Sequence, residues 1–254
     1  MFGMNIFDVE NEEKRKAVTL MFNAIARHYD FLNRLLSFGM DRYWRKKAVR
    51  IIARKYENPY ILDVATGTAD LAIAAVKMAG ATVVGMDISE KMLELGKEKI
   101  NTNGLSESIH LIQADAEKIP FPDEHFDAVM VAFGVRNFPD PAKGLSEMHR
   151  VLQNSGMIVV LEFSKPLGFP FRLMYHFYFQ RVLPLIGRLF SGEKEAYRYL
   201  PDSVRRFPDG EGFLKMLIDA GFSETHRIRL TGGVASISTG LKQQCNQVMT
   251  TQSR

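Results

Sequence analysis

The chain has 254 residues, of which 46% are hydrophobic and 24% charged, and this composition is typical of a globular protein. Its formal net charge of +4 suits an anionic substrate or membrane surface, but the bases form no dense cluster of the kind that predicts nucleic-acid binding. The single cysteine, Cys245, excludes an intrachain disulfide and a multi-cysteine metal site, and the six histidines show no metal-ligand spacing.

The length fits one domain over residues 1–254. We expect it to consist of N-terminal helices (1–58), a cofactor-binding core (59–165), a helical lid insertion (166–205) and a C-terminal helix with a strand hairpin (206–244). The first residues lack the basic start and apolar run of a signal peptide, which favours a cytoplasmic protein. The sequence leaves open whether the chain forms a homo-oligomer.

Two helices are expected between Ala17 and Ile52, after polar residues that we expect to be frayed. The first helical pattern ends near Asp30, and a loop from Asn33 to Met40 separates it from the second. Five bases are interspersed in the second pattern. They form either a solvated helix face or, as the alternative, a surface that rests on anionic lipid: Arg42, Arg45, Lys46, Lys47 and Arg50.

A strand, a tight corner and a helix between residues 60 and 78 organise the rest of the chain. Small residues at the corner, Ala65, Gly67 and Ala69, let the backbone approach a ligand closely. The nicotinamide fingerprint G-x-G-x-x-G would need a small residue at position 70, where Asp70 would instead bring negative charge to a pyrophosphate. The G-x-G-x-G spacing of S-adenosylmethionine (SAM) sites fits, and that cationic cofactor tolerates a carboxylate. The corner favours SAM.

The next predicted strand, Thr82–Asp87, ends in an acid about 20 residues past the corner, where this architecture binds ribose hydroxyls. Ser89 is the expected N-cap of a helix that runs to about Asn101. We interpret Asp87 as a ribose ligand, with an aspartate that only caps this helix as the structural alternative.

The alternation of strands and helices continues to residue 165 and predicts a parallel α/β sheet. A strand over 109–113 leads to Asp115 and Ala116, which can bind an adenine amine and pack on its ring, although a loop acid without a ligand is the alternative. A strand over 126–132 precedes the segment 133–138, where a second substrate should meet the cofactor. A helix from Pro141 to Leu152, closed by residues 154–156, precedes a strand over 157–163 that carries Glu162.

The segment from Leu167 to Phe190 is rich in aromatic residues, but three arginines and Pro184 argue against a membrane-spanning helix. We interpret it as an inserted lid at an apolar tunnel mouth, with plain core as the alternative. The stretch 197–201 could fold back over the site. A helix from Phe213 to Gly221 and two strands joined by a turn at 231–233 complete the chain.

Several reaction classes lack their residues. The chain has no Pro-Cys pair for a cytosine methyltransferase and no Gly-Lys-Ser/Thr phosphate loop, and Asn58-Pro59-Tyr60 precedes the first strand, whereas an amino-methyltransferase corner would follow the fourth. What remains is direct displacement, in which the sulfonium activates its own methyl group and the protein positions an electron-rich acceptor. A hydroquinone ring would also need a base for its hydroxyl proton. A nicotinamide-dependent oxidoreductase, a non-catalytic SAM-binding protein and an RNA methyltransferase are the rival classes.

Five stretches resemble the menaquinone/ubiquinone biosynthesis C-methyltransferases (the UbiE/MenG family), and the match runs from about Ala17 to Lys242. The stretches are His28-Tyr29-Asp30 with Asn33 and Ser37-Phe38-Gly39; Leu62-Asp63-Val64 with Gly67-Thr68-Ala69-Asp70; Phe133-Gly134-Val135-Arg136-Asn137; Leu161-Glu162-Phe163-Ser164-Lys165-Pro166; and Tyr197-Arg198-Tyr199-Leu200 with Ser203, Pro208 and Leu230-Thr231-Gly232-Gly233.

The resemblance implies a Rossmann-like class I SAM-dependent methyltransferase fold, mostly parallel, with an antiparallel C-terminal strand. It implies C-methylation of a 2-polyprenyl-1,4-naphthoquinol (demethylmenaquinol to menaquinol) or of a related benzoquinol. The lid would shield the polyprenyl tail, and the basic surface would hold the enzyme peripherally on the inner face of the plasma membrane. No metal and no nucleic acid are expected.

The resemblance also assigns residues. It carries SAM binding onto Thr68, Asp87 and the pair Asp115-Ala116, and the corner spacing adds Ala65 and Gly67 as candidate cofactor-binding residues. On the acceptor side we expect Arg136 and Asn137 to orient the quinol oxygens, with Tyr29, Glu162 and Tyr199 as further candidates and structural hydrogen bonding as the alternative for all five. The chain departs from the family at Ala132, where some members have serine, and at Ala65-Thr66, in place of glycines.

Overall fold

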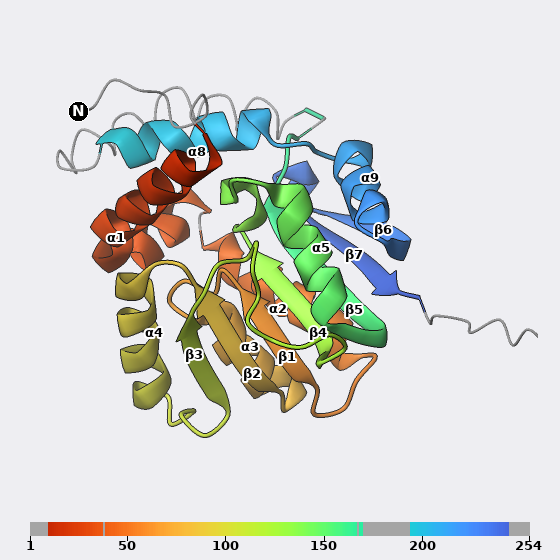
Figure 1. Ribbon diagram of the computed structural model, residues 1–254. Helices are drawn as coiled ribbons and strands as arrows, with labels where there is room; N and C mark the ends of the chain where they lie inside the picture. Colours follow the sequence, from red (N-terminus) through yellow and green to blue (C-terminus); the bar gives the residue numbers. More distant parts are fainter. Residues whose placement is uncertain (1–9, 38, 167, 170–193, 244–254) are drawn as a thin grey trace, which may run out of the picture.

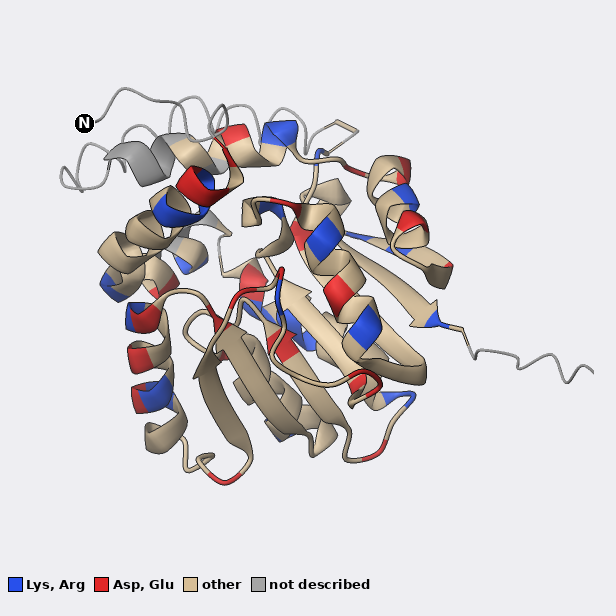
Figure 2. Ribbon diagram, viewed as in Figure 1, with Lys and Arg blue, Asp and Glu red and all other residues tan. Residues whose placement is uncertain are grey.

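The central strands of the sheet are apolar on both faces. The computed structural model describes residues 10–37, 39–166, 168–169 and 194–243, and β1 (Tyr60–Val64) is an interior strand of its seven-stranded sheet. Ile61 belongs to the core cluster on one face, while Leu62 and Val64 belong to the cluster on the other, because successive side chains of a strand point to opposite faces. Figure 2 shows the charged residues mainly on helices and loops, with few on the central strands. Burial on both faces is typical of parallel strands covered by helices.

The strand order is β3-β2-β1-β4-β5-β7-β6 (Figure 1). The parallel part consists of β1, β2 (Thr82–Asp87), β3 (Ile109–Gln113), β4 (Phe126–Ala132) and β5 (Leu152–Phe163). β6 (Phe222–Leu230) and β7 (Ala235–Lys242) are joined by the short η3 (Thr231–Gly233), and β7 inserts antiparallel between β5 and β6. So short a connection can join only antiparallel neighbours. The predicted sheet, mostly parallel with an antiparallel C-terminal strand, is confirmed.

Helices cover both faces of this sheet. One core cluster receives residues from α2 (Met40–Ala53), α3 (Asp70–Ala79) and α4 (Glu90–Thr102), and the other from α5 (Pro141–Val151) and α9 (Glu211–Asp219). α1 (Asn11–Leu36) packs against α4 and reaches over the carboxyl ends of the parallel strands, and α8 (Lys194–Arg206) contacts α1 (Figure 1). None of the helices in the described ranges has the length and apolar character that a membrane crossing requires.

The first helix differs from its prediction at both ends. The predicted frayed start is wrong for residues 11–16, and the predicted helix end near Asp30 is wrong as well, because α1 runs without a break from Asn11 to Leu36. Its first turns are fixed by partners far along the chain: the Lys14 Nζ donates to the Phe138 carbonyl at 2.8 Å. Sequence periodicity cannot detect such long-range bonds, so the polar start resembles a frayed end.

The last parallel strand also begins earlier than predicted. β5 starts at Leu152, directly after α5, whereas residues 154–156 are predicted to close the helix. Its register against β4 shifts between Leu152, opposite Phe126, and Met157, opposite Ala128, so the intervening residues form a bulge. Regular pairing begins at Met157, as expected. The predicted aromatic lid segment lies outside the described residues except for 168–169.

Candidate functional site

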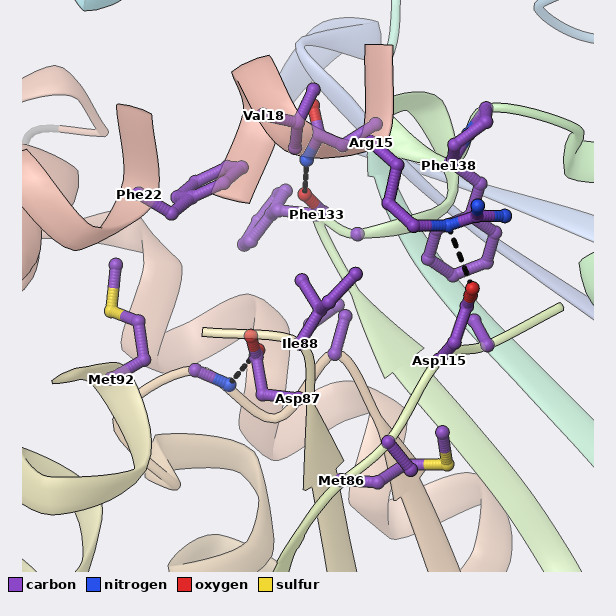
Figure 3. A pocket seen from close by; sticks show the side chains of 18 of the residues that line it. Arg15, Val18, Phe22, Met86, Asp87, Ile88, Met92, Asp115, Phe133 and Phe138 are labelled. Carbon is purple, nitrogen blue, oxygen red and sulfur yellow. Dashed lines mark hydrogen bonds and ion pairs between the residues drawn. The ribbon is translucent and has the colours of Figure 1, made fainter. Parts of the chain in front are cut away.

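A cavity lies where α1 crosses the carboxyl ends of β1, β2 and β4 (Figure 3). The space between its lining side chains, including a part that opens to solvent, is about 680 Å³. The corner after β1 forms part of its floor, and Figure 3 shows α1 on the opposite side. The side chains that α1 contributes are Arg15, Val18, Phe22 and Tyr29.

The corner itself is held in the left-handed backbone region. Ala65, Gly67 and Ala69 have φ values of 53°, 57° and 65°, a conformation that disfavours larger side chains. A Cβ added to Gly67 would lie 3.7 Å from the Tyr29 ring. Ala65 and Gly67 line the cavity, where their small size leaves room for a ligand, whereas Ala69 is buried in the core.

Asp87, at the end of β2, connects the corner to the next helix. Its Oδ2 accepts the Gly67 amide at 2.9 Å, and its Oδ1 accepts the Ser89 amide at 2.9 Å. Burial raises the pKa of Asp87, although the amides of Ser89, Gly67 and Ile88 act in the opposite direction. Each carboxylate oxygen has further acceptor capacity, and Asp87 lines the cavity. It can therefore order the loop and accept ligand hydroxyls at the same time.

Asp115 and Ala116 line another part of the cavity, next to Phe138. Arg15 forms an ion pair with Asp115, its Nε lying 2.8 Å from Asp115 Oδ2 (Figure 3), and its Nη2 lies 3.0 Å from the buried carboxylate of Glu117. Arg15 was not predicted as a site residue because its segment reads as frayed. The acids Glu12 and Glu13 in the first turn are a helix-start signal that could have revealed it.

Thr68 is not among the residues that line this cavity. Its hydroxyl donates to Asp30 at 2.6 Å and accepts from Lys99 at 2.9 Å, and Lys99 also pairs with Asp30 and Asp70. The carboxylate of Asp70 lies 3.8 Å from Arg45 as well. Both side chains at the corner are thus held by α4, and the SAM contact assigned to Thr68 stays a prediction.

Arg45 corrects the expectation of an exposed basic surface on the second helix. It is only 7% exposed, pairs with Asp41 on the preceding turn, and its guanidinium lies 5.7 Å from the centre of the Phe133 ring. The acid four residues before it is the sequence signal of this pair. Of the five bases, Arg42, Lys46 and Arg50 are exposed.

The acceptor-side candidates Arg136 and Glu162 form a buried ion pair. The Arg136 Nη1 lies 2.7 Å from Glu162 Oε2, with side-chain exposures of 7% and 4%, and the guanidinium lies 5.3 Å from the centre of the Phe163 ring. Burial raises the pKa of Glu162, and Arg136 acts in the opposite direction. Neither residue lines the cavity. The pair lies next to it, because Arg136 Nη1 donates to the carbonyl of Phe133, which does line the cavity.

Asn137 does line the cavity. Its Nδ2 donates to the Phe133 carbonyl at 3.1 Å, which fixes the orientation of the amide. Within the described part of the chain, the buried Asn137 Oδ1 and the Arg136 Nε have no hydrogen-bond partner. Buried polar atoms are nearly always paired, so these two atoms mark an open acceptor and an open donor at the site.

The two candidate tyrosines lie on different helices. Tyr29 of α1 lines the cavity, and burial raises the pKa of its hydroxyl. Tyr199 of α8 is 6% exposed, and burial raises its pKa to about 12, with Arg136 and Glu162 close enough to influence it. The fold therefore brings Tyr29 and Asn137 to the cavity itself, and Tyr199 to the neighbouring ion pair.

Asp63 of β1 is 1% exposed and accepts the Thr66 hydroxyl at 2.6 Å, and burial raises its pKa to about 7. The folded chain therefore keeps a proton that the unfolded chain releases above about pH 4. As the pH rises from about 4 to about 7, we expect this group to lower the free energy of unfolding by at most about 1.4 kcal/mol per pH unit.

Asp63→Asn should flatten this pH dependence of the free energy of unfolding, measured by urea titrations. Asp70→Asn should not, because Arg45 and Lys99, against the effect of burial, lower the pKa of Asp70. An unchanged slope in Asp63→Asn would contradict the assignment.

The fold defines a class: a Rossmann-like α/β protein with the sheet of the SAM-dependent methyltransferases. Acidic residues follow β2 and β3, and small residues form the corner after β1, as that class requires. A profile described as the ubiE/COQ5 methyltransferase family matches residues 8–242. The chain belongs to this family. It is therefore a methyltransferase, and SAM is the cofactor that its family implies.

Curated relatives cover nearly the whole chain. A protein of Geotalea uraniireducens named ubiquinone/menaquinone biosynthesis C-methyltransferase UbiE is 51% identical over 232 residues, which are 91% of this chain and 98% of the relative. A demethylmenaquinone methyltransferase of Porphyromonas gingivalis is 43% identical over 231 residues, covering 90% and 94%. A solved SAM-dependent methyltransferase of Aquifex aeolicus has a TM-score of 0.57 at 21% identity and covers 78% and 89%. It supports the fold alone.

Proposed function

We propose that this chain transfers the methyl group of SAM to a ring carbon of a polyprenyl hydroquinone, converting demethylmenaquinol to menaquinol and accepting a benzoquinol as a related substrate. The observation that carries the proposal is that Asp87 and Asp115, the cofactor-type acids, line the same cavity as Tyr29 and Asn137. The names of the two relatives specify quinone biosynthesis. A cofactor and an acceptor can therefore meet within this one cavity.

The residues present fit the cofactor. When bound, SAM supplies an electrophilic methyl group that needs no further activation. Asp87 would accept the ribose hydroxyls, and Asp115 with Ala116 would hold the adenine, while Ala65 and Gly67 leave room for the rest of the molecule. Thr68 would act on this site through Asp30 and Lys99, which tie α1 and α4 to the corner.

The acceptor needs to lose a hydroxyl proton as its ring carbon becomes nucleophilic. Asn137 Oδ1 is buried at the cavity and has no partner among the described residues. It would accept a hydrogen bond from a hydroxyl group of the quinol. Arg136 would stabilise the oxygen that gains negative charge, but it stays protonated and cannot be the base. Glu162, held beside Arg136, would take the proton directly or through a water, and Tyr29 and Tyr199 would orient the ring.

The proposal is tested with purified protein, methyl-labelled SAM and a demethylnaphthoquinol with a short prenyl chain. We expect label in the quinone product and no turnover with NADH in place of SAM. A strain that lacks the protein should accumulate a quinone lighter by one methylene unit. Binding of S-adenosylhomocysteine (SAH) without methylation of either naphtho- or benzoquinol would contradict the proposal, and label in RNA would favour a rival class.

A cytoplasmic protein that touches the membrane peripherally would suit so apolar a substrate. Exposed bases Arg42, Lys46 and Arg50 recur at helical spacing on α2, beside Tyr43, which is 43% exposed. Each base near an anionic surface contributes about 1 kcal/mol. α1 adds exposed apolar side chains, Leu20 at 69% and Phe31 at 54%. These features support contact with the anionic inner leaflet.

Co-sedimentation with liposomes tests this contact. Reversing the three exposed charges of α2 (Arg42→Glu, Lys46→Glu, Arg50→Glu) should reduce binding to anionic vesicles at least tenfold, since each base contributes about 1 kcal/mol. Reversing two exposed lysines of α4, Lys91 and Lys97, is the matched control and should have a smaller effect. Wild-type protein that fails to bind vesicles with or without anionic lipid would rule out the membrane contact.

A further inference from the structure

Phe133, the first residue after β4, has a backbone conformation that its side chain disfavours. Its φ is 60°, in the left-handed region, and for a bulky residue that value is a genuine outlier. Such conformations persist only where the surroundings enforce them, and they gather at functional sites. Phe133 is 4% exposed and lines the cavity (Figure 3).

The ring of Phe133 is fixed by three neighbours. It lies 4.5 Å from the Phe163 ring and 6.2 Å from Trp44, between ring centres, and Arg45 lies 5.7 Å from it. The Phe133 amide donates to the Leu161 carbonyl at 2.8 Å. These contacts stabilise the ring and the amide, and so they can hold the left-handed turn.

The turn directs one carbonyl group. The Phe133 oxygen accepts from Arg136 Nη1 at 2.6 Å and from Asn137 Nδ2 at 3.1 Å. The next residue, Gly134, is pressed against the cofactor corner, since an added Cβ would lie only 2.7 Å from the Ala65 Cβ. One residue thus connects the corner, the cavity and both acceptor-side candidates.

We propose that Phe133 is a positioning residue whose left-handed backbone presents its carbonyl to Arg136 and Asn137 and thereby sets where these side chains hold the acceptor. The inference rests on the proposed function for the identity of that acceptor. The placement of the two side chains can be measured without it. A purely packing role would need only an apolar side chain at this position, whereas the backbone role needs a residue that tolerates positive φ.

Phe133→Asn and Phe133→Val separate these roles, because asparagine tolerates left-handed backbone and valine does not. We expect kcat of the folded Val variant to fall about 100-fold, the cost of a small misplacement of catalytic groups, while the Asn variant loses less than about tenfold and SAH affinity is retained in both. Glycine also accepts positive φ and adds no buried polar group. If the Asn variant folds poorly, Phe133→Gly takes its place and should show the same small loss of kcat. A packing role predicts the reverse order, and kcat in Val equal to or above that in Asn would overturn the proposal.

The side-chain amide resonance of Asn137, assigned by its loss in Asn137→Asp, reports the bond to the Phe133 carbonyl without turnover. We expect it to shift in Phe133→Val and to stay near its wild-type position in Phe133→Asn and Phe133→Gly. An unshifted resonance in Val would overturn the inference even if the quinol is methylated. Wild-type protein without turnover, but with the expected shifts, would refute the proposed function and leave the positioning role standing.

Discussion

Replacing Arg136 by glutamine is expected to lower kcat by about 100- to 1,000-fold, the usual cost of removing one group that stabilises developing charge. Arg136 directly precedes Asn137, whose Oδ1 has no hydrogen-bond partner among the described residues. The Arg136 Nε has none among them either. Because Arg136 does not line the cofactor cavity, the affinity for SAH should stay within about threefold of wild type. Steady-state kinetics with quinol and calorimetry with SAH measure the two effects separately.

The single substitution also leaves Glu162 as a buried charge without its partner, which costs about 3–5 kcal/mol of stability. The double variant Arg136→Gln/Glu162→Gln removes both charges, so it should recover much of the stability while its kcat stays low. Recovery of kcat together with stability would show that the pair is structural. Arg227→Gln, which breaks an ion pair with Asp209 in the C-terminal part of the chain, is the matched control and should leave kcat unchanged.

Asp87→Asn is expected to weaken SAH binding about 100-fold. The carboxylate accepts the amides of Gly67 and Ser89, and an amide nitrogen in place of one oxygen would face one of these donors. Hydrogen bonds to charged groups contribute about 1.5–3 kcal/mol each, and 1.4 kcal/mol corresponds to tenfold in affinity. The corner would therefore lose an internal bond and the ligand would lose an acceptor. Calorimetric titration with SAH measures the loss.

Asp70→Asn is the matched control, because Asp70 lies at the same corner and is also an acid. Its carboxylate pairs with Lys99 and does not line the cavity. SAH affinity should therefore stay within about threefold of wild type, since no ligand contact changes. Equal losses in the two variants would mean that the corner responds to any change of charge and that Asp87 is not a ligand.

The sheet and most of its helices could be predicted from the sequence, because they follow from local patterns. The apolar run of β1, the small corner and the strand-end acid Asp87 are contiguous signals, and Ser89 caps α4 as expected, accepting the Met92 amide at 3.3 Å. The turn at 231–233 required β6 and β7 to be antiparallel neighbours. The same local rules failed for the start of α1 and for the bulge in β5, where distant partners or strand register decide.

The reasoning about Asp70 shows the limit within the site itself. Its charge is expected to face the cofactor and to disfavour a pyrophosphate, yet the carboxylate is bound by Lys99 and lies near Arg45. The spacing of small residues remains as the local signal for SAM. The sequence pattern placed Asp70 at the corner after β1, but it did not predict that the Asp70 carboxylate points toward Lys99.

By itself the sequence determined the fold class, the small-residue corner after β1 and, through its motifs, the family, because these depend on the order and size of neighbouring residues. Only the tertiary structure decided that α1 covers the cavity, that Arg15 reaches Asp115, that Arg45 is buried, and that Arg136 and Glu162 form a pair beside the cavity. Apart from the Arg45–Asp41 pair within α2, each of these joins residues far apart in the chain, and a buried charge is stable only where it has a partner.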